Sequence, residues 1–573
     1  EEAEALVFDC LDKLKKGDFS DDLFEAQRMS MLTSRIRATE NLSQLANLFL
    51  EMETTGQSYE EFLAETERIK TITKEEVIAI ANKYFGNDYL NVRSKMGSTP
   101  KDKVEKPNWK PLEAKNTNVK SDFAKMIEAE EVPEVTPQVI HFGTDVKITD
   151  ISEGFKLYSS INNVNDIFEL KFHFNYGTND DPDLDKACSY LSLQGTETKS
   201  FHDLSLELQK MGASISVYPN ENYTVVSISG FDADIDQLLR LCHEMLYQPT
   251  NDESKIQTLV DEALTNLKAS RDDASTWGTA VKEYVLYGDK STFLNHTSIK
   301  EWGKRSGEEL LAEVAEALKY DGYVTYSGGH YPDVLAKSIR KHQILPSNPL
   351  KGEESVRVEN TYNKPQVFVA HNKKFRQSNI GFYVPGEKLS LEDEAMAGLF
   401  SKYFGTDMYS IIFQEIREFR SLGYTAYASY LYDWLERIPG HLYGYLATQS
   451  DKTIDGISAM LELITDMPVR EEKFNASKEA LLKSRASNYI GFRSKPNSVR
   501  YWIMQGYDHD PRAETTEVIR KAEFQDVIGF YNRNIKDRPV IIMMSGNTKK
   551  INKKELCKFG ELTKLKYNEI FRE

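Results

Sequence analysis

The sequence has few cysteines, and none of them is placed to form a pair. The only four are Cys10, Cys188, Cys242 and Cys557, which lie far apart in a chain of 573 residues. Disulfide frameworks and thiolate metal sites need cysteines at regular or close spacing, so the sequence indicates neither. The cysteine pattern therefore does not indicate whether the protein resides in an oxidising or a reducing compartment.

Two further absences narrow the class of protein. No apolar run approaches the roughly 18 residues that a membrane-spanning helix needs, and the first residues do not resemble a signal peptide. Positively charged residues are also fewer than negatively charged ones: the chain has 72 Lys and Arg and 89 Asp and Glu, which gives a formal net charge of -17. This balance disfavours binding to nucleic acid or to an anionic membrane surface, and a basic peptide is a more compatible partner.

The chain starts with Glu rather than Met, which suggests a mature or internal piece of a longer protein. Residues 1–96 have an almost wholly helical pattern that ends in a predicted strand at 89–94. Residues 97–140 contain many charges and repeated prolines, a composition typical of a linker. A packed core cannot be built from that segment.

Residues 141–350 and 351–573 show the same order of predicted elements: strands, helices, a hairpin, further helices and a last strand. Both end in an amphipathic helix, a strand and a glycine, as residues 77–97 also do. This pattern predicts an internal duplication with two full copies and the tail of a preceding one. We expect an α+β fold of repeated sandwich domains, in which helices face an antiparallel-rich sheet.

Within the second copy, Arg417 and Tyr424 flank a predicted helix end. Apolar residues at helical spacing predict an amphipathic helix from Met408 to Arg420, and Gly423 follows before the next strand. Both side chains can therefore project to one side of a helix-to-strand corner. A guanidinium and a phenol there suit the binding of a peptide. The alternative is that they are an ordinary helix-end arginine and a half-buried tyrosine.

A known family carries a similar motif. The letters FQEIREFRSLGY, residues 413–424, resemble the C-terminal-half signature of the pitrilysin, insulin-degrading enzyme and mitochondrial processing peptidase family of zinc metallopeptidases. In that signature an Arg stands seven residues before a Tyr that follows Leu-Gly, and Arg417 and Tyr424 keep this spacing. The last part of the chain, residues 545–565, is similar to the family's domain ending.

The resemblance implies four homologous α+β domains in two halves that close on a peptide. Residues 1–96 would be the C-terminal part of the second domain, and residues 97–140 the linker between domains. Residues 141–350 would be an inactive third domain and residues 351–573 the fourth. The family's first domain carries an inverted zinc motif, His-x-x-Glu-His, which occurs nowhere in this sequence.

The third domain should contain a degenerate copy of the zinc helix. Residues 186–196, KACSYLSLQGT, end in the expected Gly-Thr and place Lys186, Ser189 and Tyr190 at the ligand positions. None of the three is a usual zinc ligand. We therefore expect neither a metal site nor a residue with a zinc-binding or general-base role in this chain.

The function that the resemblance implies is the C-terminal half of a zinc metalloendopeptidase that encloses and cleaves peptides. Arg417 and Tyr424 would bind substrate, and zinc would be bound by an N-terminal half from the same precursor or a separate chain. The alternative is a non-catalytic scaffold or peptide-binding subunit of the same family. Family habit favours the bacterial periplasm, with the cytoplasm or an organelle left open.

The duplication bears on the Arg–Tyr pair. When Gly212 is aligned with Gly423, Leu206 and Ala213 occupy the two corresponding positions in the third domain. The fold itself therefore does not require an arginine and a tyrosine there, which favours a functional role for them.

Overall fold

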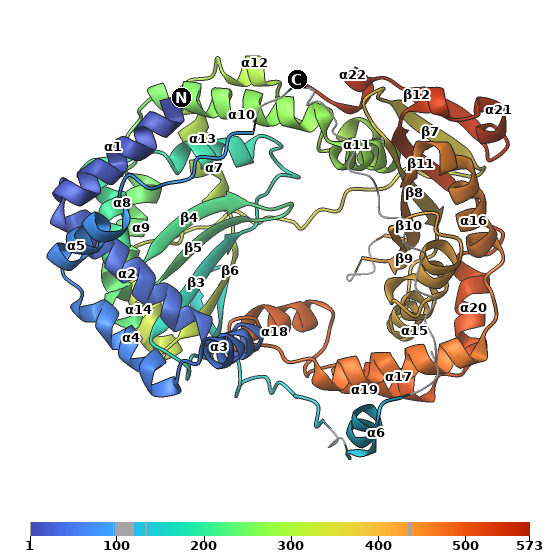
Figure 1. Cartoon of the computed structure of the whole chain (residues 1–573), viewed down its shortest axis with the longest axis horizontal. Helices are drawn as coiled ribbons and strands as arrows, with labels where there is room; N and C mark the ends of the chain where they lie inside the picture. The colour runs from blue at the N-terminus through green and yellow to red at the C-terminus, as the bar shows by residue number, and fades with distance from the viewer. Residues whose placement is uncertain (1, 95–96, 98–119, 132–134, 434–437) are drawn as a thin grey trace.

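The computed structural model of the chain describes residues 2–94, 97, 120–131, 135–433 and 438–573. Two six-stranded sheets stand opposite each other with most of their helices on the outside (Figure 1). The expected linker at 97–140 falls largely outside the described residues, apart from helix α6 (Asp122–Ala129) and the residues next to it. No helix in the described part of the chain is long and apolar enough to cross a bilayer.

The first sheet has the strand order β1-β2-β6-β3-β5-β4. Its strands are β1 (Lys147–Ser152), β2 (Phe155–Ile161), β3 (Ile167–Phe174), β4 (Ser214–Pro219), β5 (Thr224–Phe231) and β6 (Gly322–Gly328). Its helices are α7 (Leu184–Leu191), α8 (Phe201–Lys210), α9 (Ile235–Tyr247), α10 (Ser254–Asp272), α11 (Ala274–Tyr287), α12 (Ile299–Trp302), α13 (Gly307–Ala317) and α14 (Pro332–Lys341). We call these elements the first repeat.

The second sheet has the order β12-β7-β11-β8-β10-β9. Its strands are β7 (Gln366–His371), β8 (Gln377–Pro385), β9 (Thr425–Leu431), β10 (His441–Gln449), β11 (Ile541–Gly546) and β12 (Glu561–Leu565). Its helices are α15 (Leu391–Ser401), π-helices η3 (Lys402–Thr406) and η4 (Phe413–Phe419), α16 (Thr453–Thr465), α17 (Glu471–Ser487), α18 (Lys495–Met504), α19 (Arg512–Lys521), α20 (Phe524–Asn534), α21 (Lys553–Leu556) and α22 (Tyr567–Ile570). We call these elements the second repeat.

The two sheets have the same internal pairing, so the predicted α+β fold with two helix-flanked sheets is confirmed. In each, the last inner strand lies between a parallel and an antiparallel neighbour: β6 between β2 and β3, and β11 between β7 and β8. The outer edge differs, because β1 pairs antiparallel to β2 whereas β12 pairs parallel to β7. The same edge position is thus filled from opposite ends of the repeat.

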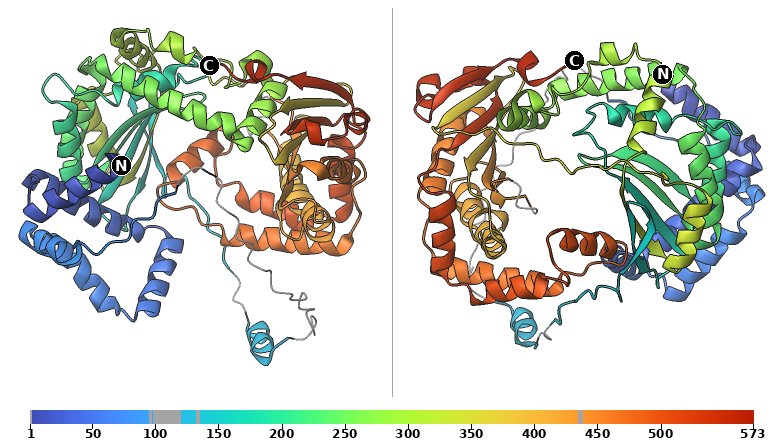
Figure 2. Two further views of the ribbon diagram at one scale, coloured as in Figure 1. Left: turned by 45° about the horizontal axis from the view of Figure 1, so that its top comes forward. Right: turned by 180° about the vertical axis from the view of Figure 1, so that it is seen from behind.

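Each sheet is covered on one face by a helix that belongs to the other repeat. Helix α11 of the first repeat packs on β7, β8 and β11, where Trp277 joins a core with Phe368 and Met543. Helix α18 of the second repeat packs on β2 and β6, where Trp502 joins a core with Tyr158. This exchange connects the two repeats through helices, and the views in Figure 2 show the two sheets standing apart from each other.

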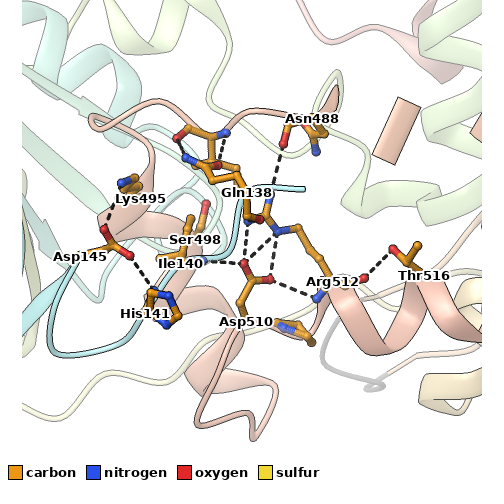
Figure 3. Close-up of polar contacts among 12 residues, drawn as sticks. Gln138, Ile140, His141, Asp145, Asn488, Lys495, Ser498, Asp510, Arg512 and Thr516 are labelled. Atoms are coloured by element: carbon orange, nitrogen blue, oxygen red, sulfur yellow. Dashed lines mark hydrogen bonds and ion pairs between the residues drawn. The ribbon is translucent and has the colours of Figure 1, made fainter. Parts of the chain in front are cut away.

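A polar joint fastens the segment before β1 to the second repeat (Figure 3). The backbone N–H of Ile140 donates to Asp510 over 3.0 Å, and Arg512 donates to the carbonyl oxygen of Gln138 over 2.9 Å. Arg512 also donates to the Asp510 carboxylate over 2.6 Å. The carboxylate is almost fully buried, so this joint is specific in its geometry.

The N-terminal residues form five helices beside the first repeat, away from the second sheet (Figure 1). They are α1 (Glu2–Lys16), α2 (Asp21–Ala38), α3 (Leu42–Thr55), α4 (Tyr59–Thr71) and α5 (Lys74–Tyr84). The strand predicted at 89–94 is wrong for this structure, in which these residues belong to no helix or strand. Residues 89–94 form no strand because no described strand lies beside them to supply a ladder of hydrogen bonds.

Candidate functional site

The helix that carries Arg417 is wider than an ordinary α-helix. It begins at Ile411, three residues later than predicted, and is π-helical over η4. At its end the N–H of Arg420 donates to the oxygen of Glu415 over 3.2 Å, and the N–H of Leu422 to that of Ile416 over 3.0 Å. Such widened turns are often found at functional sites. The buried Ile416 points into the core and leaves Arg417 toward the surface.

A strained three-residue loop then leads into β9. Ser421 has a φ of 50°, a left-handed conformation that side chains other than glycine rarely adopt. A Cβ atom on Gly423 would lie 2.4 Å from the carbonyl oxygen of Ala447, so only glycine fits against β10. The Thr448 hydroxyl donates to the Leu422 oxygen over 2.5 Å. These constraints fix the position of Tyr424, the residue before β9.

The structure brings Arg417 and Tyr424 together. The guanidinium carbon of Arg417 lies 4.1 Å from the ring centroid of Tyr424 and 4.7 Å from that of Phe413. Tyr424 is 79% exposed. Among the described residues, the ion pair recorded for Arg417 is a 3.4 Å contact with its neighbour Glu418, so its remaining N–H groups are available to a ligand.

The neighbouring arginine has a different role. Arg420 binds Glu462 over 2.9 Å and thereby ties η4 to α16. This ion pair holds the pKa of Glu462 below its usual range. Arg420 is therefore a structural residue, and it offers a matched control for Arg417 three positions away.

An open hollow of about 440 Å³ adjoins the pair. Besides Arg417 and Tyr424, its polar lining includes Gln377, Gln449 and Lys452. Guanidinium, phenol, amide and ammonium groups all donate hydrogen bonds, which suits the carbonyl and carboxylate oxygens of a peptide. The hollow is partly open to solvent, and Tyr424 in its lining is mostly exposed.

The equivalent corner of the first repeat is covered. Ala213 precedes β4 as Tyr424 precedes β9. A Cβ atom on Gly212, the residue before Ala213, would lie 3.0 Å from the side chain of Met29 in α2. Helix α2 packs along α8, and Lys210 forms an ion pair of 2.5 Å with Asp22. One corner therefore serves as a packing contact, whereas the matching corner with the Arg–Tyr pair is open.

Two family profiles match the chain. The profile described as "Peptidase M16 inactive domain" matches residues 334–481, which include Arg417 and Tyr424. The profile described as "Insulinase (Peptidase family M16)" matches residues 185–285 in the first repeat. Both profiles describe peptidase family M16, and together they cover less than half of the chain. This confirms the resemblance to the pitrilysin-like peptidases that the motif around Arg417 indicates.

One curated relative is named a zinc protease. The uncharacterized zinc protease YmxG of Bacillus subtilis is 20% identical over 249 residues, which cover 42% of this chain and 58% of that protein. The chain thus matches less than two thirds of that relative's length.

Solved structures share the fold. A peptidase M16 inactive domain from Pseudomonas fluorescens matches with a TM-score of 0.57 at 16% identity, covering 70% of this chain and 98% of that one. The periplasmic protease PqqL from Escherichia coli matches with a TM-score of 0.55 at 12% identity, covering 94% of this chain and 62% of that one. At these identities the likeness concerns the fold alone.

The three residues that the resemblance places at the zinc-ligand positions make structural contacts. On α7, Lys186 forms an ion pair of 2.5 Å with Asp183, and the Tyr190 hydroxyl donates to Asn251 over 2.6 Å. The Ser189 hydroxyl donates within its own helix. These side chains do not fit a zinc ion, and no group of three or more potential ligands occurs in the described ranges.

Tyrosines of the β9–β10 hairpin lie on two different faces. Tyr427, Tyr443 and Tyr445 cluster on one face, with ring centroids of Tyr427 and Tyr445 5.5 Å apart. Lys282 of α11 lies 5.3 Å from the Tyr443 ring, so this face is the one that α11 partly covers. Tyr430 lies in the opposite core. Its place on the buried side follows from strand alternation.

Proposed function

We propose that this chain is the C-terminal half of a zinc metalloendopeptidase. An N-terminal half with the His-x-x-Glu-His motif, from the same precursor or a separate chain, is its partner. The supporting facts are the matches of two regions to models of peptidase family M16, one of them its inactive domain, and the relative named a zinc protease. In this scheme residues 1–96 end a second domain, residues 97–140 are the linker, and residues 141–350 and 351–573 are the third and fourth domains.

The single observation that carries the proposal is the difference between the two equivalent corners. The corner of the first repeat rests on α2, which belongs to the N-terminal helices. By the internal repeat, the Arg417 corner should face the corresponding part of the partner half. That placement would close the open side of the hollow and put the pair near the partner's reaction centre.

In this role Arg417 and Tyr424 bind the substrate backbone. The guanidinium donates to a peptide carbonyl, while the phenol donates one directional hydrogen bond, and stacking of the two groups fixes their relative orientation. When the carbonyl oxygen gains negative charge, the same donors stabilise it. Zinc, when bound by the partner half, would activate the attacking water. This chain supplies orientation and charge stabilisation.

A second candidate is a scaffold or peptide-binding subunit without chemistry. It is favoured by the ion pair of Lys186 and the hydrogen bonds of Ser189 and Tyr190, which give these three side chains structural roles. For the compartment we propose the periplasm, since the structural neighbour PqqL is named a periplasmic protease.

Substitutions at the pair test the peptidase role. In the assembled enzyme, we expect Arg417→Ala and Tyr424→Phe to lower kcat/KM for a peptide roughly 100-fold, because each removes a donor to the reacting carbonyl. Zinc content and complex formation should not change. Arg420→Ala is the control and should keep turnover within about threefold. An assembled, zinc-loaded enzyme that cleaves normally without either side chain would contradict the proposal.

A further inference from the structure

Part of one face of the second sheet is open. In β9 and β10 every second residue is buried and the residues between them are not, so each strand turns one side to the core and the other side away from it. Helix α11 packs on this other side at β7, β11 and β8, and the sheet continues beyond these strands with β10 and β9 (Figure 1). Thr425, Tyr427 and Leu431 of β9 are exposed. The face is therefore accessible at β9 and β10.

Three tyrosines lie on this accessible part of the face. Tyr427 of β9 and Tyr445 of β10 are register partners, and their rings are stacked at an interplanar angle of 30°. The ring centroid of Tyr443, two residues before Tyr445, lies 6.4 Å from that of Tyr427. Their register neighbours Ser429 and Gly381 are uncharged. We call Tyr427, Tyr443 and Tyr445 the tyrosine surface, and its rings offer apolar faces against which other apolar groups can pack.

The first repeat shows that the fold does not require these tyrosines. Ser216 and Ser227 are register partners in β4 and β5, as Tyr427 and Tyr445 are in β9 and β10. The two pairs occupy matching places when the corner glycines of the two repeats are aligned. An equivalent sheet thus folds with two small side chains here, which leaves the tyrosines of the second repeat available for binding.

The tyrosine surface is continuous with the hollow beside Arg417. Ala447 and Gln449 follow Tyr445 at every second position of β10, so the three side chains lie on the same face. Ala447 and Gln449 also line the hollow, together with Gln377, the register partner of Gln449. A peptide held by Arg417 therefore reaches the tyrosines without leaving the sheet.

A second hollow lies at the opposite end of the same face. Its volume is about 530 Å³, and its lining includes Leu431 and His441, which are register partners at the ends of β9 and β10. Strand β10 has nine residues and runs from one hollow to the other. At about 3.3 Å per residue this strand spans roughly 30 Å. An extended peptide of about eight or nine residues covers that length.

We propose that the tyrosine surface binds the apolar side chains of an extended peptide whose carbonyl group is held at Arg417 and Tyr424. In an extended chain alternate side chains point the same way, so every second residue of the peptide faces the rings. The surface thus favours peptides that have apolar residues at alternate positions and reach from the Arg417 hollow to the rings. This inference rests on the proposed function only in taking a peptide as the ligand of that hollow.

The dimensions of the surface favour a single extended chain over a folded partner. Its accessible part is two strands wide, roughly 10 Å, which gives an area of roughly 300 Å² over the length of β10. A stable protein–protein interface needs about 800 Å² on each partner. Lys282 of α11 borders the surface beside Tyr443, and no carboxylate stands among the register neighbours of the tyrosines. The surroundings therefore favour an uncharged, apolar segment over a basic one.

Peptide binding measured without cleavage tests the inference. The probes are two fluorescein-labelled ten-residue peptides, in which Gly alternates with Leu in one and with Ser in the other. Fluorescence anisotropy gives their affinity for the complete chain, alone and in complex with the partner half, in the presence of EDTA. We expect the Leu peptide to bind roughly tenfold more tightly than the Ser peptide, because its side chains pack on the rings.

Variants at Tyr427 locate the binding. Tyr427→Ser, which introduces the residue found at the matching place of the first repeat, should weaken binding of the Leu peptide roughly fivefold, and Tyr427→Phe should keep it within about twofold because the ring remains. Tyr218→Ser is the matched control, since Tyr218 is an exposed tyrosine on β4 of the other sheet, 43% exposed against 39% for Tyr427. It should leave the affinity unchanged.

The outcomes separate this inference from the proposed function. A complex that binds the two peptides equally, or binds neither, overturns the inference even if it cleaves peptides when zinc is supplied. Equal losses for Tyr427→Ser and Tyr218→Ser also overturn it. Discrimination by the chain alone that disappears in the complex shows that the partner half covers the rings, which overturns it as well. A complex that discriminates as expected but neither binds zinc nor cleaves supports the inference and overturns the peptidase proposal.

Discussion

At the scale of single residues, the Arg417–Tyr424 pair is built by stacking rather than by an ion pair. A guanidinium 4.1 Å from a tyrosine ring is attracted by the ring's negative face, and at an exposed site this is worth about 0.5–1 kcal/mol. The side chains therefore hold each other in place while their donors remain free. If the pair binds a peptide as a unit, its two members should not act independently.

A double-mutant cycle measures that coupling. We expect Arg417→Ala and Tyr424→Ala to show a coupling of about 0.5–1 kcal/mol in the free energy of peptide binding by the assembled enzyme. The cycle of Arg420→Ala with Tyr424→Ala serves as the comparison and should be additive. Additive losses for Arg417 and Tyr424 would show that the stacked pair does not function as one site.

Asp510 makes the polar joint of Figure 3 dependent on pH. Burial alone would raise the pKa of its carboxyl group, but hydrogen bonds from Arg512 and from the Ile140 N–H outweigh this effect and hold the pKa below its usual range. Because the folded pKa lies below the unfolded one, the charged carboxylate stabilises the fold above about pH 3.9. That contribution is lost as the pH falls through the lower folded pKa.

The variant Asp510→Asn checks this assignment. At neutral pH we expect it to reduce the free energy of unfolding by about 3–5 kcal/mol, because Arg512 loses its buried partner. The difference from the unaltered protein, measured by denaturant unfolding, should shrink as the pH falls below about 3.9. Asp508→Asn, in the same loop but exposed, should have little effect. A destabilisation that is constant with pH would contradict the electrostatic origin.

The sequence was sufficient to predict that Arg417 and Tyr424 lie on one side of a helix-to-strand corner, but not their environment. Spacing and the family motif indicated Arg417 and Tyr424, and the repeat indicated that Ala213 takes the place of Tyr424. The π-helical turn, the left-handed Ser421 and the ion pair of Arg420 depend on contacts with β10 and α16, which are distant in sequence. Local periodicity carries no signal for them.

At the scale of secondary-structure elements, the exchanged helices α11 and α18 explain why neither repeat is expected to behave independently. Each contributes a tryptophan to the core of the opposite sheet. Periodicity predicts that such helices exist, but not that they cross to the other repeat. Tertiary packing decides which helix covers the apolar face of which sheet.

Trp277→Ala tests the exchange. Trp277 is 6% exposed, and its loss from the core with Phe368 should reduce the free energy of unfolding by about 3–5 kcal/mol. Hydrogen exchange should show loosening in β7, β8 and β11 of the second repeat, although Trp277 belongs to the first. Trp302→Ala, whose side chain lies in the first repeat's own core, should loosen that repeat instead. Loosening confined to the first repeat in both variants would contradict the exchange.

Strand prediction succeeded where a strand has its neighbours in the chain. The duplicated order of strands and helices was predictable from sequence, because alternation and turn residues are local signals. Strands β1 and β12 were missed, since edge strands are short and weakly patterned. Residues 89–94 show the opposite error: the pattern is that of a strand, but the described chain provides no partner for it.

At the scale of the whole molecule, three features of the described chain are open to solvent. The hollow beside Arg417 is open, several large apolar side chains of α1–α5 are exposed, and so are residues 89–93. They lie on different parts of the chain, at the Arg417 corner and on the N-terminal helices. The proposed partner half would have to close the Arg417 corner for the pair to act on a peptide.

Peptide cleavage by the two halves, apart and together, tests the central claim most directly. We predict that the partner half alone binds zinc, that this chain alone neither binds zinc nor cleaves a quenched fluorescent peptide, and that the mixture cleaves it. The orienting donors of Arg417 and Tyr424 would then be joined to the partner's zinc-activated water. Cleavage by this chain alone, or a stable zinc-loaded mixture that cleaves no peptide, would contradict the account.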